Sequence, residues 1–199
     1  MAKIALGQSK MVKKPLSGLM HVAVYVGFVI INIEVLEIII DGIFGTHRIL
    51  AAPLGSLYDV LIGSFEILAL LVLVACVLFL IRRNVLNIRR FGFREMIGWP
   101  KTDANIILIV EVLLMFAFLT MNGADAVLQK MGEDHYIEAG MFPISGLLVP
   151  FFDGLSTTSL IAIERGTWWF HIIGILLFLN YLPYSKHFLL IYITTRQYH

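Results

Sequence analysis

Four histidines flank the first and last long apolar segments of the chain, at a spacing suited to binding metal centres between two helices. His21 and His47 stand at either end of the apolar segment 19–44, and His171 and His187 flank the core of the last one. If the two segments cross a membrane in opposite directions, His21 comes to the same level as His187. His47 then comes to the same level as His171. Two opposed pairs of imidazoles in a helical bundle are the arrangement that ligates two b-type haem irons.

Each of these histidines also has a second interpretation. An imidazole is amphipathic, so any one of them could be an anchor at the lipid–water boundary instead of a ligand. The grouping into two levels favours ligation for the set as a whole, whereas His135 and His199 fit no pair. We therefore predict that haem iron is bound by His21, His47, His171 and His187.

Acidic residues inside the apolar segments are the second feature that could do chemistry. On a helical wheel, Glu34, Glu37 and Asp41 share one face of the first segment. Glu66 and Glu111 lie centrally in the next two segments. A carboxyl group within a membrane span is costly and normally faces protein, water or a partner. Proton delivery to a quinone, pairing with a haem propionate or its arginine, and a neutral carboxyl bonded to a neighbouring helix all remain open for these residues.

The elements that must position these residues are membrane helices. Of the 199 residues, 59% are apolar and only 15% are charged, which is far from the composition of soluble proteins. Segments 19–44, 57–81 and 105–121, and one that begins at Trp168, are long enough to cross about 30 Å of hydrocarbon. Segment 147–164 is interrupted by proline, aspartate and glycine and then by a Ser/Thr cluster, which indicates an interfacial or partly re-entrant segment. We predict an all-α membrane protein, a four-transmembrane-helix bundle with an additional short interfacial segment.

The positions of lysine and arginine predict the orientation. Four lysines precede the first apolar segment, and six basic residues lie between the second and third. The loop 123–146 is instead mostly acidic. Since cytoplasmic loops carry the excess of lysine and arginine, we expect both termini in the cytoplasm and this loop outside.

The single cysteine limits the chemistry that the chain can support by itself. Cys76 lies in an apolar segment, so a disulfide framework and a thiolate-ligated iron–sulfur cluster within this chain are both excluded. Nothing in the charge pattern indicates a nucleic-acid partner. The alternative to electron transfer is a haem-free structural membrane subunit or a transporter with interfacial histidines. An internal inverted repeat would favour transport, and the sequence shows none.

Three stretches carry a resemblance to a known family: "GLMHVAVYVGFVIINIEVLEIIIDGIFGTHR", "WWFH" and "NYLPYSKHF". They resemble the membrane domain of bacterial iron–sulfur-binding oxidoreductases related to the heterodisulfide reductase membrane subunit and the nitrate reductase gamma subunit. The resemblance implies a dihaem cytochrome b-like transmembrane domain over 1–188 and a divergent C-terminal tail over 189–199. It also implies electron transfer between membrane quinone and a cytoplasmic iron–sulfur protein or domain, in the bacterial cytoplasmic (inner) membrane. The chain would then be the electron-transfer part of an oxidoreductase and not a complete enzyme.

The chain also departs from that family. Relatives usually have one more helix before this region and a cysteine-rich domain after it, so we expect a truncated version or a separately encoded iron–sulfur partner. Relatives place a histidine at the position of Leu189, which is five helical turns from His171. His187 lies about 160° away from that face unless a kink at Pro183 rotates it. The resemblance thus favours His171 as a ligand, and leaves open whether the chain binds one haem or two.

Overall fold

The computed structural model of the chain describes residues 22, 33–86 and 99–181. Within these ranges the chain consists of helices and connecting turns and contains no strand. The prediction of an all-helical protein is confirmed for this part of the chain. The predicted tail 189–199 lies outside the described residues.

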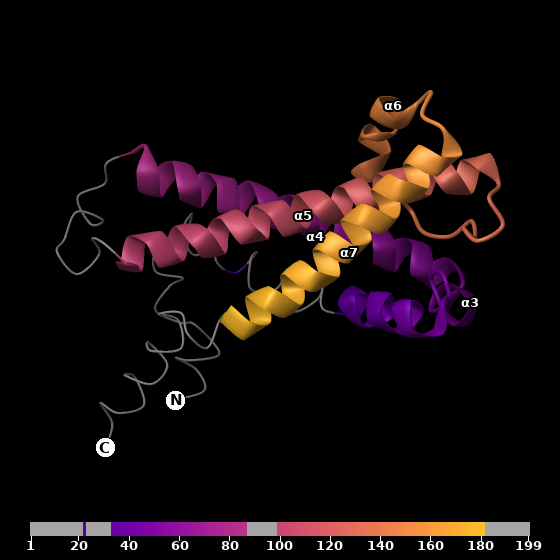
Figure 1. The fold of residues 1–199 in the computed structure, drawn as a ribbon, viewed down its shortest axis with the longest axis horizontal. Helices are drawn as coiled ribbons and strands as arrows, with labels where there is room; N and C mark the ends of the chain where they lie inside the picture. Colours follow the sequence, from indigo (N-terminus) through magenta and orange to yellow (C-terminus); the bar gives the residue numbers. More distant parts are fainter. Residues whose placement is uncertain (1–21, 23–32, 87–98, 182–199) are drawn as a thin grey trace, which may run out of the picture.

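Three helices within the described ranges are long and apolar enough to cross a membrane: α4 (Ser56–Asn84), α5 (Trp99–Met131) and α7 (Thr157–Tyr181). They confirm that the chain is a membrane protein. Both α4 and α7 pack against α5, and α7 crosses over it (Figure 1). The first predicted span is described mainly from residue 33 onward, so the four-helix bundle stays a prediction.

Residues 33–44 are helical and belong to that first predicted span. The helix ends at Gly45, whose φ of 67° lies in the left-handed region that glycine adopts without a steric penalty. A short helix, α3 (Ala51–Leu54), then leads through Gly55 into α4. As Figure 1 shows, these elements lie at the same end of the bundle as the connection between α5 and α7.

The last long helix begins earlier than the sequence predicted. Segment 147–164 was expected to be interfacial, with the final span starting at Trp168. In the structure, the segment begins at the end of the 3₁₀ turn η3 (Ser145–Leu147). It continues through the single helical turn α6 (Val149–Phe152) and includes the start of α7.

Ser156 explains the early start of α7. Its Oγ accepts the backbone N–H of Ser159 at 3.2 Å, and its carbonyl oxygen accepts that of Leu160 at 3.0 Å. These are the bonds of an N-cap residue. The Ser/Thr cluster that suggested a broken span is therefore a signal for the start of a helix.

The third span also differs from its prediction, because α5 continues ten residues past Met121, to Met131. Asn122 and Asp125 lie on this helix and not in an external loop. Both are almost fully buried, with 0% and 3% of their surface exposed. Their polar groups bond to side chains on other elements, which offsets the cost of burying them.

Apolar side chains fill the space between the long helices. Phe65 of α4, Phe118 of α5 and Ile172 of α7 belong to one buried cluster. A Cβ atom added to Gly174 would lie 2.6 Å from Leu114 Cδ2, so the glycine allows α7 to approach α5 closely. Close to this contact, the His171 ring of α7 reaches the backbone carbonyl of Leu114 on α5.

Candidate functional site

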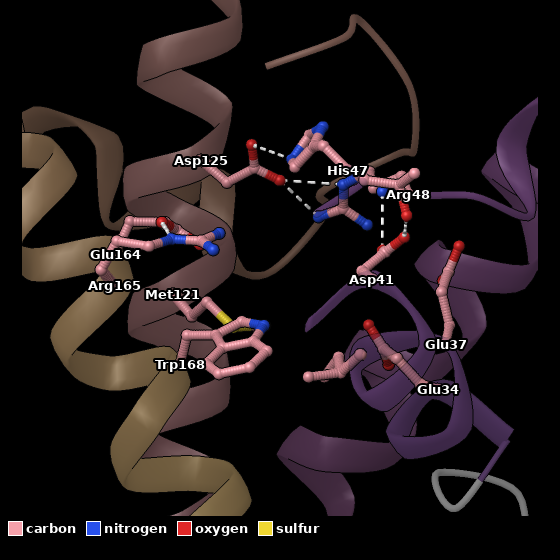
Figure 2. Close-up of a pocket in the computed structure, with 12 residues that line it drawn as sticks. Glu34, Glu37, Asp41, His47, Arg48, Met121, Asp125, Glu164, Arg165 and Trp168 are labelled. Carbon is pink, nitrogen blue, oxygen red and sulfur yellow. Dashed lines mark hydrogen bonds and ion pairs between the residues drawn. The ribbon is translucent and has the colours of Figure 1, made fainter. Parts of the chain in front are cut away.

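A polar pocket of about 40 Å³ lies between the helix 33–44, α5 and α7 (Figure 2). Glu34, Glu37 and Asp41 line it from the first helix, and Trp168 lines it from α7. The prediction that these three carboxyl groups share one face is confirmed. At roughly 10–15 Å³ for each water centre, the pocket has room for about three or four water molecules and not for a quinone ring.

Arg48 occupies the centre of the polar network beside this pocket. Its Nε and Nη2 donate to Asp125 Oδ2 at 2.9 and 2.6 Å, and its Nη1 donates to the Tyr58 hydroxyl at 3.1 Å. Nη2 also donates to Asn122 Oδ1 at 3.2 Å. Burial alone would lower the pKa of the Arg48 guanidinium, but the Asp125 carboxylate and the Tyr58 oxygen hold this pKa above its ordinary value. Arg48 therefore keeps its charge inside the protein.

The backbone at Arg48 is held in an uncommon conformation. Its φ of 52° is in the left-handed region, where a residue with a side chain is disfavoured by roughly 1–2 kcal/mol. Asp41 stabilises the turn, because its carboxylate accepts the backbone N–H groups of Arg48 at 2.8 Å and Ile49 at 3.1 Å. The turn after the first helix is thus built to aim the guanidinium at α5.

His47 bonds to protein through both of its ring nitrogens. Nδ1 accepts the backbone N–H of Ile137 at 3.2 Å, and Nε2 lies 3.1 Å from Asp125 Oδ1. Because a backbone N–H can only donate, the proton of a neutral His47 sits on Nε2 and is donated to Asp125. The rings of His135 and Tyr136 lie 5.8 and 5.1 Å from the His47 ring. The ligand role of His47 stays a prediction, and it would require one of these bonds to break.

His171 differs from His47, because only one of its ring nitrogens has a partner among the described residues. It is 1% exposed on α7, and its Nδ1 lies 3.0 Å from the carbonyl oxygen of Leu114 on α5. The carbonyl can only accept, so Nδ1 carries the proton and Nε2 has a free lone pair. Nε2 is buried and has no hydrogen-bond partner among the described residues. A histidine that donates one N–H to a backbone carbonyl and leaves its other nitrogen free is arranged as metal-ligating histidines are.

The predicted pairing of the histidines remains open. His21 and His187 lie outside the described residues. His47 bonds to Asp125 and Ile137, whereas His171 bonds to Leu114, so the structure brings these two described histidines to different partners.

Glu66 holds the segment that precedes η3. Its Oε2 accepts the backbone N–H groups of Ile144 at 2.8 Å and Ser145 at 3.1 Å, and its Oε1 accepts Asn122 Nδ2 at 3.2 Å. Three donors satisfy this buried carboxyl group, which offsets the cost of burying it. The contacts of Glu66 thus position the connection between α5 and α7.

A further buried carboxylate lies on α7. Glu164 accepts the Tyr136 hydroxyl at 3.0 Å and Arg165 Nη2 at 2.6 Å. Burial raises the pKa of the Tyr136 phenol, and the adjacent Glu164 carboxylate raises it further. The guanidinium of Arg165 lies 5.5 Å from the centroid of the Trp168 ring. Tyr136 therefore ties the loop after α5 to the start of α7.

Sequence reasoning missed the polar partners at the centre of this network, Arg48, Tyr58 and Asn122. Each is a polar residue next to, or inside, a predicted span, which is the signal by which they could have been found. Within the described ranges, no group of three or more His, Cys, Asp or Glu side chains is arranged to hold a metal ion. A haem iron needs only one protein nitrogen on each side, so His171 is the candidate site that the geometry offers.

Comparison with known proteins finds two similar proteins, both named as oxidoreductases. The chain is 28% identical over 183 residues to the probable iron–sulfur-binding oxidoreductase FadF of Bacillus subtilis (strain 168). This alignment covers 91% of this chain and 24% of that protein. The chain is 24% identical over 189 residues to the EtfAB:quinone oxidoreductase of Syntrophomonas wolfei subsp. wolfei, covering 92% of this chain and 25% of that protein. The chain is thus similar to part of an iron–sulfur-binding oxidoreductase and to part of a quinone oxidoreductase.

The chain spans about a quarter of the length of the curated relatives it matches. Comparisons with protein-family models and with solved structures give no match. The similarity to iron–sulfur oxidoreductases that the sequence predicted is thus confirmed. The narrower relationship, to the heterodisulfide reductase membrane subunit and the nitrate reductase gamma subunit, stays a prediction.

Proposed function

We propose that this chain carries electrons between membrane quinone and an iron–sulfur oxidoreductase module in the cytoplasm, by way of b-type haem. The observation that carries the proposal is the state of His171, a buried imidazole whose Nδ1 is fixed by Leu114 and whose Nε2 is free. The two similar proteins support quinone and an iron–sulfur module as the electron partners, since one is named as iron–sulfur-binding and the other as a quinone oxidoreductase. Three candidate spans among the described residues support a route within a membrane.

The donor chemistry at His171 fits an axial ligand of haem. Donation of its Nδ1 proton to a backbone carbonyl raises the basicity of the opposite nitrogen and fixes the orientation of the ring. A haem bound there would supply a one-electron carrier whose potential depends on its axial ligands and on the polarity around it. His21, His47 and His187 are the candidates for the opposite ligand. Of these, His47 would have to give up a bond to Asp125 or Ile137.

The experiment that tests the proposal compares haem binding by two histidine variants. The full chain is expressed with haem supplementation, purified in detergent, and assayed for haem per chain and for its reduced-minus-oxidised spectrum. His171→Ala should lose at least one low-spin haem, because the iron loses an axial nitrogen. His135→Ala is the matched control, since that side chain is exposed on the loop after α5.

Two results would contradict the proposal. One is a native chain that stays colourless after haem supplementation, which would favour a haem-free membrane subunit. The other is a haem content and spectrum in His171→Ala equal to those of the native chain.

A further inference from the structure

Six carboxyl groups lie in or beside the polar pocket, and five of them have hydrogen-bond donors of their own. The five bond to backbone N–H groups, hydroxyls, an amide, guanidinium groups or the His47 ring. The sixth, Glu34, is 3% exposed, and its Oε2 has no partner among the described residues. The five bonded groups are Glu37, Asp41, Glu66, Asp125 and Glu164.

The charges around the pocket do not balance if all six groups are ionised. The described cations that face them are Arg48 and Arg165, and His47 is neutral when Ile137 donates to it. The Tyr58 hydroxyl is a donor to Glu37 and adds no charge. Six negative charges against two positive ones would repel one another strongly inside the protein. Glu34 loses least by taking a proton, because its Oε2 has no donor among the described residues that would stabilise the charged form.

The position of Glu34 lets its carboxyl group exchange a proton with water. Glu34, Glu37 and Asp41 follow one another at intervals of three and four residues, so they form one stripe about 10 Å long on the helix 33–44. Glu34 and Glu37 are buried at the floor of the pocket, Asp41 is half-buried, and Thr46 at its mouth is exposed. Figure 2 shows the three carboxyl groups on this helix, across the pocket from Trp168.

We propose that Glu34 is the proton-exchanging group of a hydrated pocket, and that it passes protons between the aqueous phase beside Thr46 and a quinone. The part of this inference that concerns quinone rests on the proposed function. The pocket has room for about three or four waters, which would bridge Glu34 to Glu37 and Asp41.

The chemical step is a balanced proton transfer. Reduction of a quinone takes two electrons, which the iron–sulfur module supplies, and two protons. The O–H bond of the Glu34 carboxyl breaks as an O–H bond forms on the quinone oxygen, through a pocket water. The Glu34 carboxylate then takes a proton from the aqueous phase at the mouth of the pocket, and a second transfer of the same kind delivers the second proton. Oxidation of a hydroquinone runs the same transfer in reverse, and the electrons leave to the iron–sulfur module.

The first test is infrared spectroscopy of the purified full chain, which needs neither haem nor quinone. At neutral pH the native chain should show the C=O stretching band of a protonated carboxyl that Glu34→Gln lacks. In D₂O this band should move to lower frequency within minutes, because the pocket is hydrated. Glu111→Gln is the control, since Glu111 is a buried carboxyl of α5 that does not line the pocket. It should leave the Glu34 component in place.

The proposal is overturned if Glu34→Gln removes no protonated-carboxyl band, because Glu34 is then ionised. It is also overturned if the band persists unshifted through hours in D₂O, because the pocket is then sealed from water.

The second test measures oxidation of duroquinol with ferricyanide as the electron acceptor, in the full chain reconstituted with haem. Glu34→Gln should lower the maximal rate by roughly 10²-fold, as loss of a general acid–base group does. Haem content should be unchanged, and Glu138→Gln, at an exposed carboxyl after α5, should match the native rate. A native rate in Glu34→Gln overturns the role toward quinone. Failure of the native chain to bind haem or to oxidise duroquinol would defeat the proposed function instead, and would leave the infrared result standing.

Discussion

Replacing Arg48 by methionine should destabilise the fold far more than the same change at an exposed lysine. The Arg48 guanidinium donates twice to Asp125, and the two side chains are only 9% and 4% exposed. Arg48→Met leaves the Asp125 carboxylate with His47 as its remaining bonded side chain among the described residues. Removing one member of a buried ion pair costs about 3–5 kcal/mol, because the other charge stays buried without compensation. We expect a loss of that size in the free energy of unfolding.

A double-mutant cycle separates the ion pair from the loss of packing. Asp125→Leu alone should cost a similar amount, since it leaves the Arg48 charge uncompensated. The double variant Arg48→Met/Asp125→Leu buries neither charge. Sites within one salt-bridge network couple by up to about 3 kcal/mol, so the double variant should be less destabilised than the sum of the single variants by about 2–3 kcal/mol.

The assay is reversible unfolding in mixed micelles by increasing dodecyl sulfate, followed by tryptophan fluorescence. Lys130→Met is the control, because Lys130 is exposed in the last turn of α5. Removing a solvated charge at such a position should change the free energy of unfolding by less than about 0.5 kcal/mol. A cost below about 1 kcal/mol for Arg48→Met, or strict additivity in the cycle, would refute the reasoning.

Two further predictions follow from close contacts of α7 and α4. Gly174→Ala should destabilise the chain by about 1–3 kcal/mol in the same assay, because its Cβ would lie 2.6 Å from an α5 side chain. Gly166→Ala has open space and should gain up to about 1 kcal/mol, so equal effects at the two glycines would show that α7 does not approach α5 this closely. Glu66→Gln should speed proteolysis within 132–144, because an amide oxygen replaces the carboxylate that accepts two backbone N–H groups there. The exposed Glu138→Gln is its control, and equal cleavage rates would argue against the tether.

Features that depend on local periodicity could be predicted from the sequence. The apolar segment 57–81 became α4, with ends that differ by at most three residues. The stripe of Glu34, Glu37 and Asp41 lines one pocket because residues three and four apart share a helix face. Both predictions needed only the geometry of a single helix.

Features that depend on contacts between distant residues could not be predicted in this way. Asp125 was assigned to an external acidic loop, because its partner Arg48 lies 77 residues away in the sequence. Without that pairing, an aspartate at the end of an apolar segment indicates the end of a span. His171 was predicted to be a ligand from its residue type and its depth in the span. Its proton, however, is fixed by a carbonyl at Leu114, 57 residues away, which no local pattern reveals.

The reduced-minus-oxidised optical spectrum of the purified full chain, recorded beside that of His171→Ala, tests the central claim most directly. The account predicts sharp reduced α and β bands of low-spin b-type haem in the native chain, and the loss of at least one haem per chain in the variant. The buried, unpartnered Nε2 of His171 is the atom on which this prediction rests. A native chain without such bands after haem supplementation, or a variant with the native spectrum and haem content, would contradict it.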